Sequence, residues 1–546
     1  MKNKRSLLLL IGVVILFSCN SQQKADLLIY NATIYTVDST FSTAEAMVVM
    51  GGKIIATGKT ADLQKQYDAK EKVDAEGKFI YPGLIDAHAH FFGYASGLST
   101  VDLVGTESWE EILQKLQAFE KNLSAGAWLI GRGWDQNDWK VKEFPSKEKL
   151  DELFPNRPVF LTRVDGHAAI ANQKALDLAN VKAGDKLTGG DVEVRNGKLT
   201  GILVDNATDL VSTKIPDPAE ADLTKSLLEA QKNCFAVGLT TIDDCGLGYE
   251  AVEFAKKLHD NGSLKMRLYI MLSDAKKNFD YANRTGKIKT DRLNVSSFKV
   301  YADGALGSRG ACLLEPYADK PGWSGFLLSP IPHYDSVAKI LYEKGWQMCT
   351  HAIGDSGNRM VLNTYGKYLK GKNDRRWRIE HSQVVNKNDF DLFGKYSVIP
   401  SVQPTHGTSD MYWAGDRLGA ERVKGAYAFK QLMDQNGWIP LGTDFPVEDI
   451  SPFKTFFAAV VRKDAKGYPP GGYQMENALT REQALRGMTI WAAKSNFEEH
   501  EKGSLEKGKF ADFIILDRDL LKAAEGELLG VNVLRTYVEG EMVYKR

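Results

Sequence analysis

The most constraining feature of the chain is the segment Asp86-Ala87-His88-Ala89-His90, which closes a short apolar run over residues 79–85. Successive side chains of a β-strand alternate between its two faces, so His88 and His90 point to the same side, together with Asp86. Two imidazoles at this spacing can share one metal ion. The chain has only nine histidines in 546 residues, so this pair favours a metal site over two unrelated strand histidines.

Four other predicted strand ends carry residues that can bind metal. They are Lys299 within segment 296–301, His351 at the end of 346–351, His381 at the end of 377–381 and Asp444 at the end of 438–444. Helix-like sequence follows each of these segments, so strands and helices alternate along the chain. Such alternation, with reactive side chains at the carboxyl ends of the strands, is typical of an α/β TIM (β/α)8 barrel.

Eight strands of that barrel can be assigned within residues 83–499. The first ends at His90, and the others are expected at residues 239–243, 266–270, 298–300, 348–351, 378–381, 398–402 and 439–444. The stretch from about 95 to 220 is too long for a simple crossover and contains strand-like sequence of its own. We therefore predict a subdomain inserted after strand 1, above the barrel mouth, where loops tend to set specificity.

The series His-x-His, Lys, His, His and Asp on successive strands resembles the amidohydrolase superfamily over nearly the whole mature length. Four longer motifs resemble its amidohydrolase 3 type of metal-dependent hydrolase, the branch that includes the N-substituted formamide deformylases. They are residues 133–139 (GWDQNDW), 165–169 (DGHAA), 301–309 (YADGALGSR) and 403–406 (QPTH). The resemblance implies a hydrolase that uses a metal-activated hydroxide to cleave a C–N bond in a small amide, N-formyl compound, cyclic amide or carbamate.

The two ends of the chain have similar strand-rich, turn-punctuated sequence. In the resembling family such ends combine into one small β-sandwich beside the barrel. We therefore expect residues 26–82 and 500–546 to form the two parts of a discontinuous domain.

The resemblance also implies roles for the predicted metal ligands. In two-metal members the strand lysine reacts with carbon dioxide, and the resulting carbamate bridges both ions. The roles implied here are His88, His90 and Asp444 at the more buried ion, His351 and His381 at the more exposed ion, and carboxylated Lys299 as the bridge. Imidazole ligands favour zinc, with manganese, iron or cobalt open. A mononuclear member with unmodified Lys299, or a lysine in an ordinary salt bridge, is the alternative.

Two of these residues need particular chemistry. An unperturbed lysine has a pKa of about 10.4 and is a poor metal ligand, so burial and nearby positive charge are expected to lower the pKa of Lys299. Metal binding lowers the pKa of water from 15.7 to about 7. Asp444 is the expected catalytic proton shuttle, taking the proton of the attacking hydroxide and passing it to the leaving amine.

Candidate substrate-binding residues lie in the family-like motifs. His167 and His406 are expected to hydrogen-bond a substrate or its developing oxyanion, with a helix cap or a structural contact as an equal alternative. Arg309 is expected to clamp a carboxylate or carbonyl, or else to brace its loop. Trp134 is expected to form a pocket wall.

The N-terminus has the composition of an export signal. Residues 1–18 combine Lys2, Lys4 and Arg5 with an apolar run over residues 7–17 that is too short for an ordinary spanning helix. Residues 16–19 (LFSC) resemble a bacterial lipobox, which predicts lipidation of Cys19 and a polar tether over residues 19–25. An ordinary cleaved signal or a retained anchor is the alternative. A lipidated protein would be anchored to a membrane of the bacterial cell envelope, facing the periplasm or the exterior.

Charge restricts the class of partner. Without residues 1–18 the chain carries 67 basic and 70 acidic residues, because the leader contains three basic residues and no acid. No basic excess exists to neutralise phosphates, which argues against nucleic acid. The predicted partners are a small-molecule substrate and, through the lipid, a membrane; a homo-oligomer is left open.

Three functions are compatible with these observations. The first is a two-metal amidohydrolase, and the second is a mononuclear deaminase or esterase on the same fold. The third is a nonenzymatic ligand-binding lipoprotein, which the intact ligand series weakens because a pure binder does not need all six positions.

Overall fold

The computed structural model describes residues 22–124 and 126–546. The expected signal at residues 1–18 and the lipidation site Cys19 lie outside the described residues. The first strand, β1 (Gln23–Tyr30), begins within the expected tether, because Lys24 and Ala25 already pair with β6 (Tyr67–Asp74). Residues 23–25 therefore belong to a sheet and not to a polar tether.

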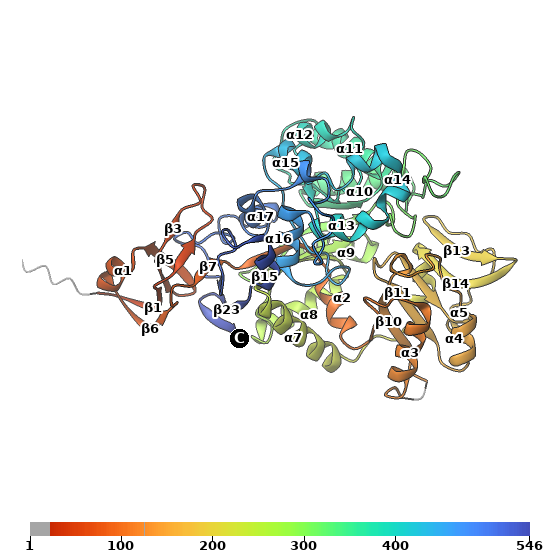
Figure 1. Ribbon diagram of the computed structural model, residues 1–546, viewed down its shortest axis with the longest axis horizontal. Helices are drawn as coiled ribbons and strands as arrows, with labels where there is room; N and C mark the ends of the chain where they lie inside the picture. Colours follow the sequence, from red (N-terminus) through yellow and green to blue (C-terminus); the bar gives the residue numbers. More distant parts are fainter. Residues whose placement is uncertain (1–21, 125) are drawn as a thin grey trace, which may run out of the picture.

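Strands from both ends of the chain lie side by side at one end of the molecule (Figure 1). A four-stranded sheet contains only N-terminal strands, in the order β5 (Lys53–Gly58), β4 (Ala46–Met50), β1 and β6. A six-stranded sheet, the two-ended sheet, joins the two ends of the chain. Its strand order is β24 (Glu541–Lys545), β23 (Val533–Val538), β22 (Phe513–Leu516), β7 (Phe79–Pro82), β2 (Thr33–Tyr35) and β3 (Thr43–Ala44). One shared apolar core contains Leu27, Met47, Ile80 and Phe513, so neither end buries its apolar face without the other.

The centre of the molecule is a nearly closed parallel barrel of the TIM type. Seven strands follow one another in the order β8 (Leu84–Ala89), β15 (Leu239–Leu247), β16 (Arg267–Ser273), β18 (Leu293–Tyr301), β19 (Gln347–Ala352), β20 (Arg378–His381) and β21 (Ile399–Ser401). A short strand, β17 (Ile288–Lys289), pairs antiparallel to β18. Side chains on both faces of these strands are buried, as expected of a parallel sheet covered by helices.

The expected eighth strand, residues 439–444, is not a regular strand, but it still joins the two edges of the barrel. Gly442 N donates to Val402 O at 3.0 Å on one side, and Asp444 N donates to His88 O at 2.8 Å on the other. Pro440 has no N–H to donate, and Asp444 has a φ of +64°. A Cβ at Gly442 would lie 2.6 Å from the backbone nitrogen of His88, so only glycine allows this close approach.

Amphipathic helices cover the outside of the barrel. In α8 (Tyr249–Asp260), for example, Val252, Ala255 and Leu258 are buried while Glu250 and Lys257 face outward. The other long helices of this layer are α7 (Glu220–Ala236), α9 (Lys276–Thr285), α10 (Ile331–Lys344), α11 (Asp355–Leu369), α15 (Phe429–Asn436) and α16 (Pro452–Val461). Shorter helices complete it: α12 (Phe390–Tyr396), α17 (Arg481–Gly487) and α18 (Ile490–Ser495).

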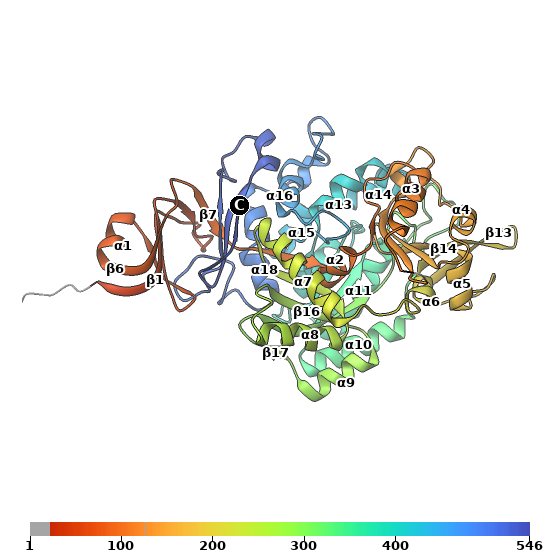
Figure 2. The same ribbon diagram turned by 90° about the horizontal axis from the view of Figure 1, so that it is seen from below.

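Between β8 and β15 the chain forms a separate sheet at the opposite end of the molecule from the two-ended sheet (Figures 1 and 2). Its strand order is β13 (Gly190–Arg195), β14 (Lys198–Asp205), β12 (Ala168–Ala171), β11 (Val159–Arg163), β10 (Leu129–Trp134) and β9 (Val101–Asp102). Its helices are α3 (Trp109–Glu120), α4 (Glu148–Leu153), α5 (Gln173–Ala179) and α6 (Asp209–Ser212). It contacts barrel loops directly, since Arg417 Nη2 donates to Asn137 Oδ1 at 3.0 Å.

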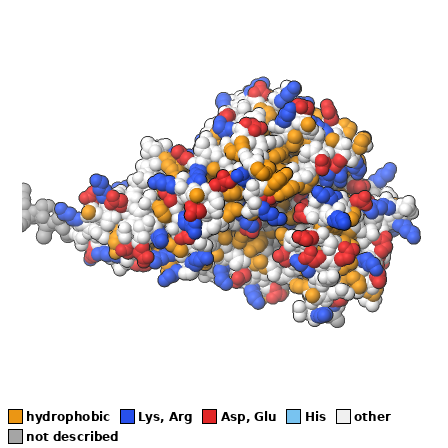
Figure 3. Space-filling view, viewed as in Figure 1, with side chains coloured by type: hydrophobic (Ala, Val, Ile, Leu, Met, Phe, Trp, Pro, Cys, Tyr) orange, Lys and Arg blue, Asp and Glu red, His pale blue; other side chains and the backbone are white. Residues whose placement is uncertain are grey.

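The surface mixes charges of both signs. On the face in Figure 3, Lys and Arg side chains alternate with Asp and Glu side chains across all parts of the molecule, and apolar side chains gather over the barrel. Among residues 22–124 and 126–546, no helix combines the length and the apolar content needed to cross a bilayer.

A buried ion pair connects the barrel to the two-ended sheet. Arg267 on β16 donates to Asp512 through Nε at 2.6 Å and through Nη2 at 3.0 Å. Arg267 is fully buried and Asp512 is 5% exposed. The same guanidinium lies 4.0 Å from the ring centre of Phe510. The charge of Arg267 is therefore compensated only when the C-terminal segment is in place.

We expect Asp512→Ala to lower the free energy of unfolding by about 3–5 kcal/mol, because it leaves the buried Arg267 without its main partner. Urea unfolding followed by circular dichroism would measure the loss. The control is Asp26→Ala, which removes an exposed carboxylate paired with Lys70 and should change stability little. Equal effects of the two substitutions would show that the ion pair does not hold the barrel to the sheet.

Candidate metal centre

The predicted ligands meet at the carboxyl end of the barrel. His88 and His90 lie at the end of β8, and Lys299 lies on β18. The others are His351 on β19, His381 at the end of β20 and Asp444 in the closing segment. The barrel brings them together because parallel strands all end on the same side.

Three of the six residues form a tight cluster. One ligand atom from each of His88, His381 and Asp444 lies within 4.8 Å of the others. His90 adjoins this cluster, with Nε2 at 3.2 Å from Asp444 Oδ1. His351 adjoins it from the other side, with its ring centre 4.5 Å from that of His381.

Each of three histidines has one ring nitrogen held by a neighbour. His88 Nδ1 lies 2.5 Å from Glu380 Oε2, and His90 Nδ1 lies 3.1 Å from the carbonyl oxygen of Cys245. His381 Nδ1 lies 2.8 Å from Gln403 Oε1. These contacts fix the rings and direct the other nitrogen inward, as partners of metal-binding histidines do.

The donor set fits a divalent metal ion. Oδ1 of Asp444 is buried, and although it lies 3.2 Å from His90 Nε2, it makes no well-aligned hydrogen bond among the described residues. Such burial is costly for a carboxylate unless a cation compensates it. Imidazole and carboxylate donors suit zinc and neighbouring transition metals. The residues placed to hold such ions are His88, His90, His351, His381 and Asp444, with Lys299 beside them.

Electrostatics keep these groups in their metal-binding forms. Burial, followed by the charge of Lys299, lowers the pKa of His88 to about 4. Burial also lowers the pKa values of His351 and His381 well below the usual range. For Asp444 burial acts the other way, but nearby histidines, His88 first, bring the pKa of its carboxyl well below its usual value. Neutral imidazoles and an ionised carboxylate are the forms that bind metal.

The prediction that the pKa of Lys299 is lowered is wrong when only the protein's own side chains act on it. Burial alone would lower it, but ionisable acidic groups around the amine, Cys245 and Tyr301 foremost, raise the pKa above its ordinary value. Lys299 is 1% exposed, and its Nζ lies 3.1 Å from His88 Nε2. The side chain thus points into the cluster, but its neighbours do not supply the positive charge that the expectation required.

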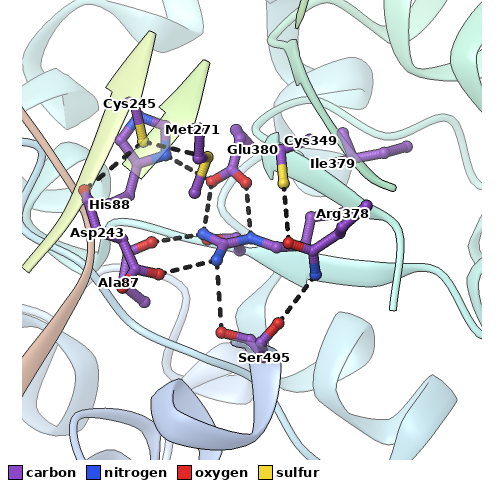
Figure 4. A network of polar contacts seen from close by, with 12 residues as sticks. Ala87, His88, Asp243, Cys245, Met271, Cys349, Arg378, Ile379, Glu380 and Ser495 are labelled. Atoms are coloured by element: carbon purple, nitrogen blue, oxygen red, sulfur yellow. Dashed lines mark hydrogen bonds and ion pairs between the residues drawn. The ribbon is translucent and has the colours of Figure 1, made fainter. Parts of the chain in front are cut away.

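Below the cluster, an arginine and two carboxylates form a fully buried network (Figure 4). Glu380 Oε1 forms an ion pair with Arg378 Nε at 2.7 Å. Its other oxygen, Oε2, accepts from Arg378 Nη2 at 3.1 Å and contacts His88. Arg378 Nη1 also lies 2.9 Å from Asp243 Oδ2. Burial would raise the pKa of Glu380, but Arg378 and then His88 hold it far below the usual value. A carboxylate is thereby fixed behind the ring of His88.

Two cavities reach the predicted ligands, the smaller one at five of them and the larger one at His90. A larger one of about 700 Å³ extends between β15 and the inserted sheet, and a smaller one of about 240 Å³ extends toward α13 (Pro404–Ser409). His90, Asp165, His167 and Tyr301 line both cavities. A substrate at the cluster would therefore touch both the barrel and the inserted sheet.

Two of the four predicted substrate-binding residues lie at these cavities. His167 Nδ1 lies 2.6 Å from Asp205 Oδ1, and its ring centre is 4.9 Å from that of His351. Although burial acts against it, the contact with Asp205 raises the pKa of His167. His406 Nε2 lies 3.6 Å from Asp444 Oδ2.

The other two lie elsewhere, and their expected roles need correction. Arg309 pairs with Asp319 at 2.8 Å and lines a separate cavity, so it braces its loop and does not clamp a group at the metal cluster. Trp134 is fully buried in the core of the inserted sheet, where Nε1 donates to Leu161 O at 2.9 Å. It supports the subdomain and does not form a wall of either cavity.

Comparison with known proteins agrees with this geometry. A family model described as "Amidohydrolase family" matches residues 71–544. The chain belongs to the amidohydrolase family. The expected family is thus confirmed, and with it a hydrolase that acts on C–N bonds.

Individual relatives cover nearly the whole amidohydrolase chain. It is 33% identical to "Protein LONG AFTER FAR-RED 3" of Arabidopsis thaliana, over 95% of this chain and 92% of that protein. It is 28% identical to the "N-substituted formamide deformylase" of Arthrobacter pascens, over 96% and 99%. A crystal structure of an uncharacterised metal-dependent hydrolase from Pyrococcus horikoshii shares 29% identity with a TM-score of 0.75, covering 92% of this chain and 99% of that one.

Sequence reasoning missed two residues of this amidohydrolase site. Glu380 carries a detectable signal, since Arg378 and Glu380 are charged residues at alternate positions of a short strand. Arg163 lines the smaller cavity and is paired with Asp135 and Asp165. No sequence signal connects these three residues, because they meet only through the folding of the inserted sheet.

We expect Glu380→Gln to weaken metal binding by this amidohydrolase about 10- to 100-fold, because the partner that orients His88 loses its charge. Competition with a chromogenic chelator would measure the affinity.

The matched control is Glu498→Gln, which also changes a buried, paired carboxylate. Glu498 pairs with Lys289 and Lys502 and, within the described residues, has no hydrogen bond or ion pair with the predicted ligands. The Glu498→Gln variant should have a lower free energy of unfolding but an unchanged affinity for metal. Wild-type metal affinity in Glu380→Gln would refute the role given to this carboxylate.

Proposed function

We propose that this amidohydrolase uses two divalent metal ions to hydrolyse a C–N bond in a small amide, N-formyl compound, cyclic amide or carbamate. The observation that carries the proposal is the convergence of four inward-facing histidines, Asp444 and Lys299 at one end of the barrel. The name of the relative from Arthrobacter pascens, a formamide deformylase, favours the N-formyl class.

In this proposal each ion has its own ligands. The residues would be His88, His90 and Asp444 at one ion, His351 and His381 at the other, and Lys299, as a carbamate, between them. Zinc is the preferred metal, with manganese, iron or cobalt as alternatives. When bound, the ions would lower the pKa of a water molecule and polarise the substrate carbonyl.

Asp444 would move the proton. Its carboxylate is held between His90 at 3.2 Å and His406 at 3.6 Å, and one oxygen has no other partner. As water attacks the carbonyl carbon, the carboxylate would take a water proton. It would then give that proton to the nitrogen as the C–N bond breaks, so that the amine leaves neutral.

His167 and His406 would bind the substrate oxygen. His406 Nε2 is buried without a hydrogen-bond partner, and His167 is held by Asp205. A donor aimed at the developing oxyanion stabilises the transition state more than the ground state.

The proposed function is tested by screening zinc-loaded enzyme against N-formyl, N-acyl, cyclic amide and carbamate compounds. We expect turnover of one class, with Asp444→Asn retaining appreciable metal but losing about 10²- to 10⁴-fold in kcat. The absence of turnover with all four classes, or an Asp444→Asn enzyme of normal rate, would contradict the proposal.

A second variant separates the two-metal enzyme from a mononuclear deaminase or esterase. Lys299→Ala should lose metal and activity together, and short carboxylic acids should restore part of both by occupying the position of the carbamate. Metal analysis and rate measurements on the same preparation would follow this rescue. Near-normal turnover with one bound metal would favour the mononuclear enzyme.

We propose further that the enzyme is exported and lipid-anchored through Cys19 at the bacterial cell envelope. The lipobox-like residues 16–19 support this location. The first strand, β1, begins at Gln23, so only a few residues would separate the lipid from the folded enzyme.

A further inference from the structure

One wall of the smaller cavity carries carboxylates that have no cationic partner. Asp410 and Glu448 line this cavity beside His406, and Asp138 lies nearer its opening. Asp410 accepts from the Tyr427 hydroxyl at 2.8 Å, and Glu448 accepts from the Ser409 hydroxyl at 2.6 Å. Within the described part of the chain, no Lys or Arg nitrogen lies within 4.0 Å of these three carboxylates.

Neither of the two basic residues, Lys or Arg, that line the cavity pairs with these carboxylates. Arg163 is paired with both Asp135 and Asp165. Lys299 has its Nζ 3.1 Å from His88 Nε2, within the metal cluster. The charge of Asp410 and Glu448 is thus left for whatever occupies the cavity.

The two carboxylates also repel each other. Burial, and then the nearby Glu448 and Asp135, raise the pKa of Asp410 to about 7, although His406 and Tyr427 act in the opposite direction. Burial likewise raises the pKa of Glu448. A cation placed between the two would relieve this repulsion.

An independent observation indicates that the cavity receives a polar ligand. His406 is 8% exposed and lines the cavity, and its Nε2 has no hydrogen-bond partner. An unpaired buried nitrogen destabilises the fold unless a ligand satisfies it. His406 lies close to both Asp444 and Asp410, so one small molecule could contact His406 and reach the acidic wall.

We propose that the substrate carries a protonated amine close to its scissile amide, and that Asp410 and Glu448 bind this ammonium group. The inference rests on the proposed hydrolysis of a small amide and narrows its substrate class. The amide lies at the metal cluster beside His406, and the ammonium group lies against the acidic wall. A cavity of about 240 Å³ restricts this part of the substrate to a short chain.

The experiment compares two N-formyl compounds of equal length in zinc-loaded enzyme. One is the monoformyl derivative of a short diamine, which is cationic at neutral pH, and the other has a methyl group in place of the ammonium. We expect kcat/KM to be at least about tenfold higher for the cationic compound. Asp410→Asn and Glu448→Gln should each reduce this ratio by about tenfold. Because the ratio is measured on one preparation, partial loss of folded enzyme does not alter it.

The matched control is Asp191→Asn. Asp191 is a carboxylate at the separate cavity that Arg309 lines, so its substitution should leave the ratio unchanged. A wild-type ratio near one would overturn the proposal. So would a preference for the cationic compound that survives both Asp410→Asn and Glu448→Gln.

Calorimetry distinguishes failure of this inference from failure of the proposed function. Tetramethylammonium has no lone pair for a metal ion and no amide to hydrolyse, so its binding reports on the acidic wall alone. We expect saturable binding to the zinc-loaded enzyme that Asp410→Asn and Glu448→Gln weaken about tenfold and Asp191→Asn does not. If neither formamide is hydrolysed, the N-formyl substrate class fails, while the calorimetric result still supports or overturns the binding of a cation by the acidic wall.

Discussion

The site depends on the compensation of one buried charge, that of Arg378. Its guanidinium donates to Asp243 on β15, to Glu380 on β20, to Ala87 O on β8 and to Ser401 on β21. A lone charge at this depth would cost several kcal/mol, so the carboxylates and the arginine require each other. The consequence reaches the metal cluster, because the Glu380 carboxylate that compensates Arg378 also fixes the ring of His88.

Much of the barrel and the six predicted ligands could be derived from the sequence because both rest on local patterns. Alternation in residues 84–90 places two histidines on one face, and parallel strands place their ends together whatever the details of packing. The closing segment at residues 439–444 departs from a regular strand because Pro440 and Gly442 adapt it to the backbone of His88, which no local pattern encodes. Arg309 and Trp134 show the same limit. Their residue types suit a binding site, but their partners, Asp319 and Leu161, are known only from the fold.

The barrel supplies the predicted metal ligands, while the inserted sheet supplies part of the substrate pocket. The chemistry can therefore be inferred from the sequence more readily than the substrate. The predicted metal ligands all come from barrel strands or from the segment that closes them. The cavity walls combine His167 and Arg163 from the inserted sheet with His406 and Asp410 from the segment after β21. A change in the insertion can therefore reshape the substrate pocket while the metal cluster keeps its geometry, which is the usual way in which one barrel supports many substrates.

The sheet that joins both chain ends has a consequence for the timing of folding. β7 precedes the whole barrel, yet its antiparallel neighbour β22 starts at Phe513. During synthesis the ribosome releases β7 long before β22 exists, so the edge of β7 stays unpaired while more than four hundred residues emerge. Pairings across such a separation form slowly, and an unpaired apolar edge is prone to aggregation. A chaperone that covers β7 until β22 has been synthesised would therefore protect the chain from aggregation.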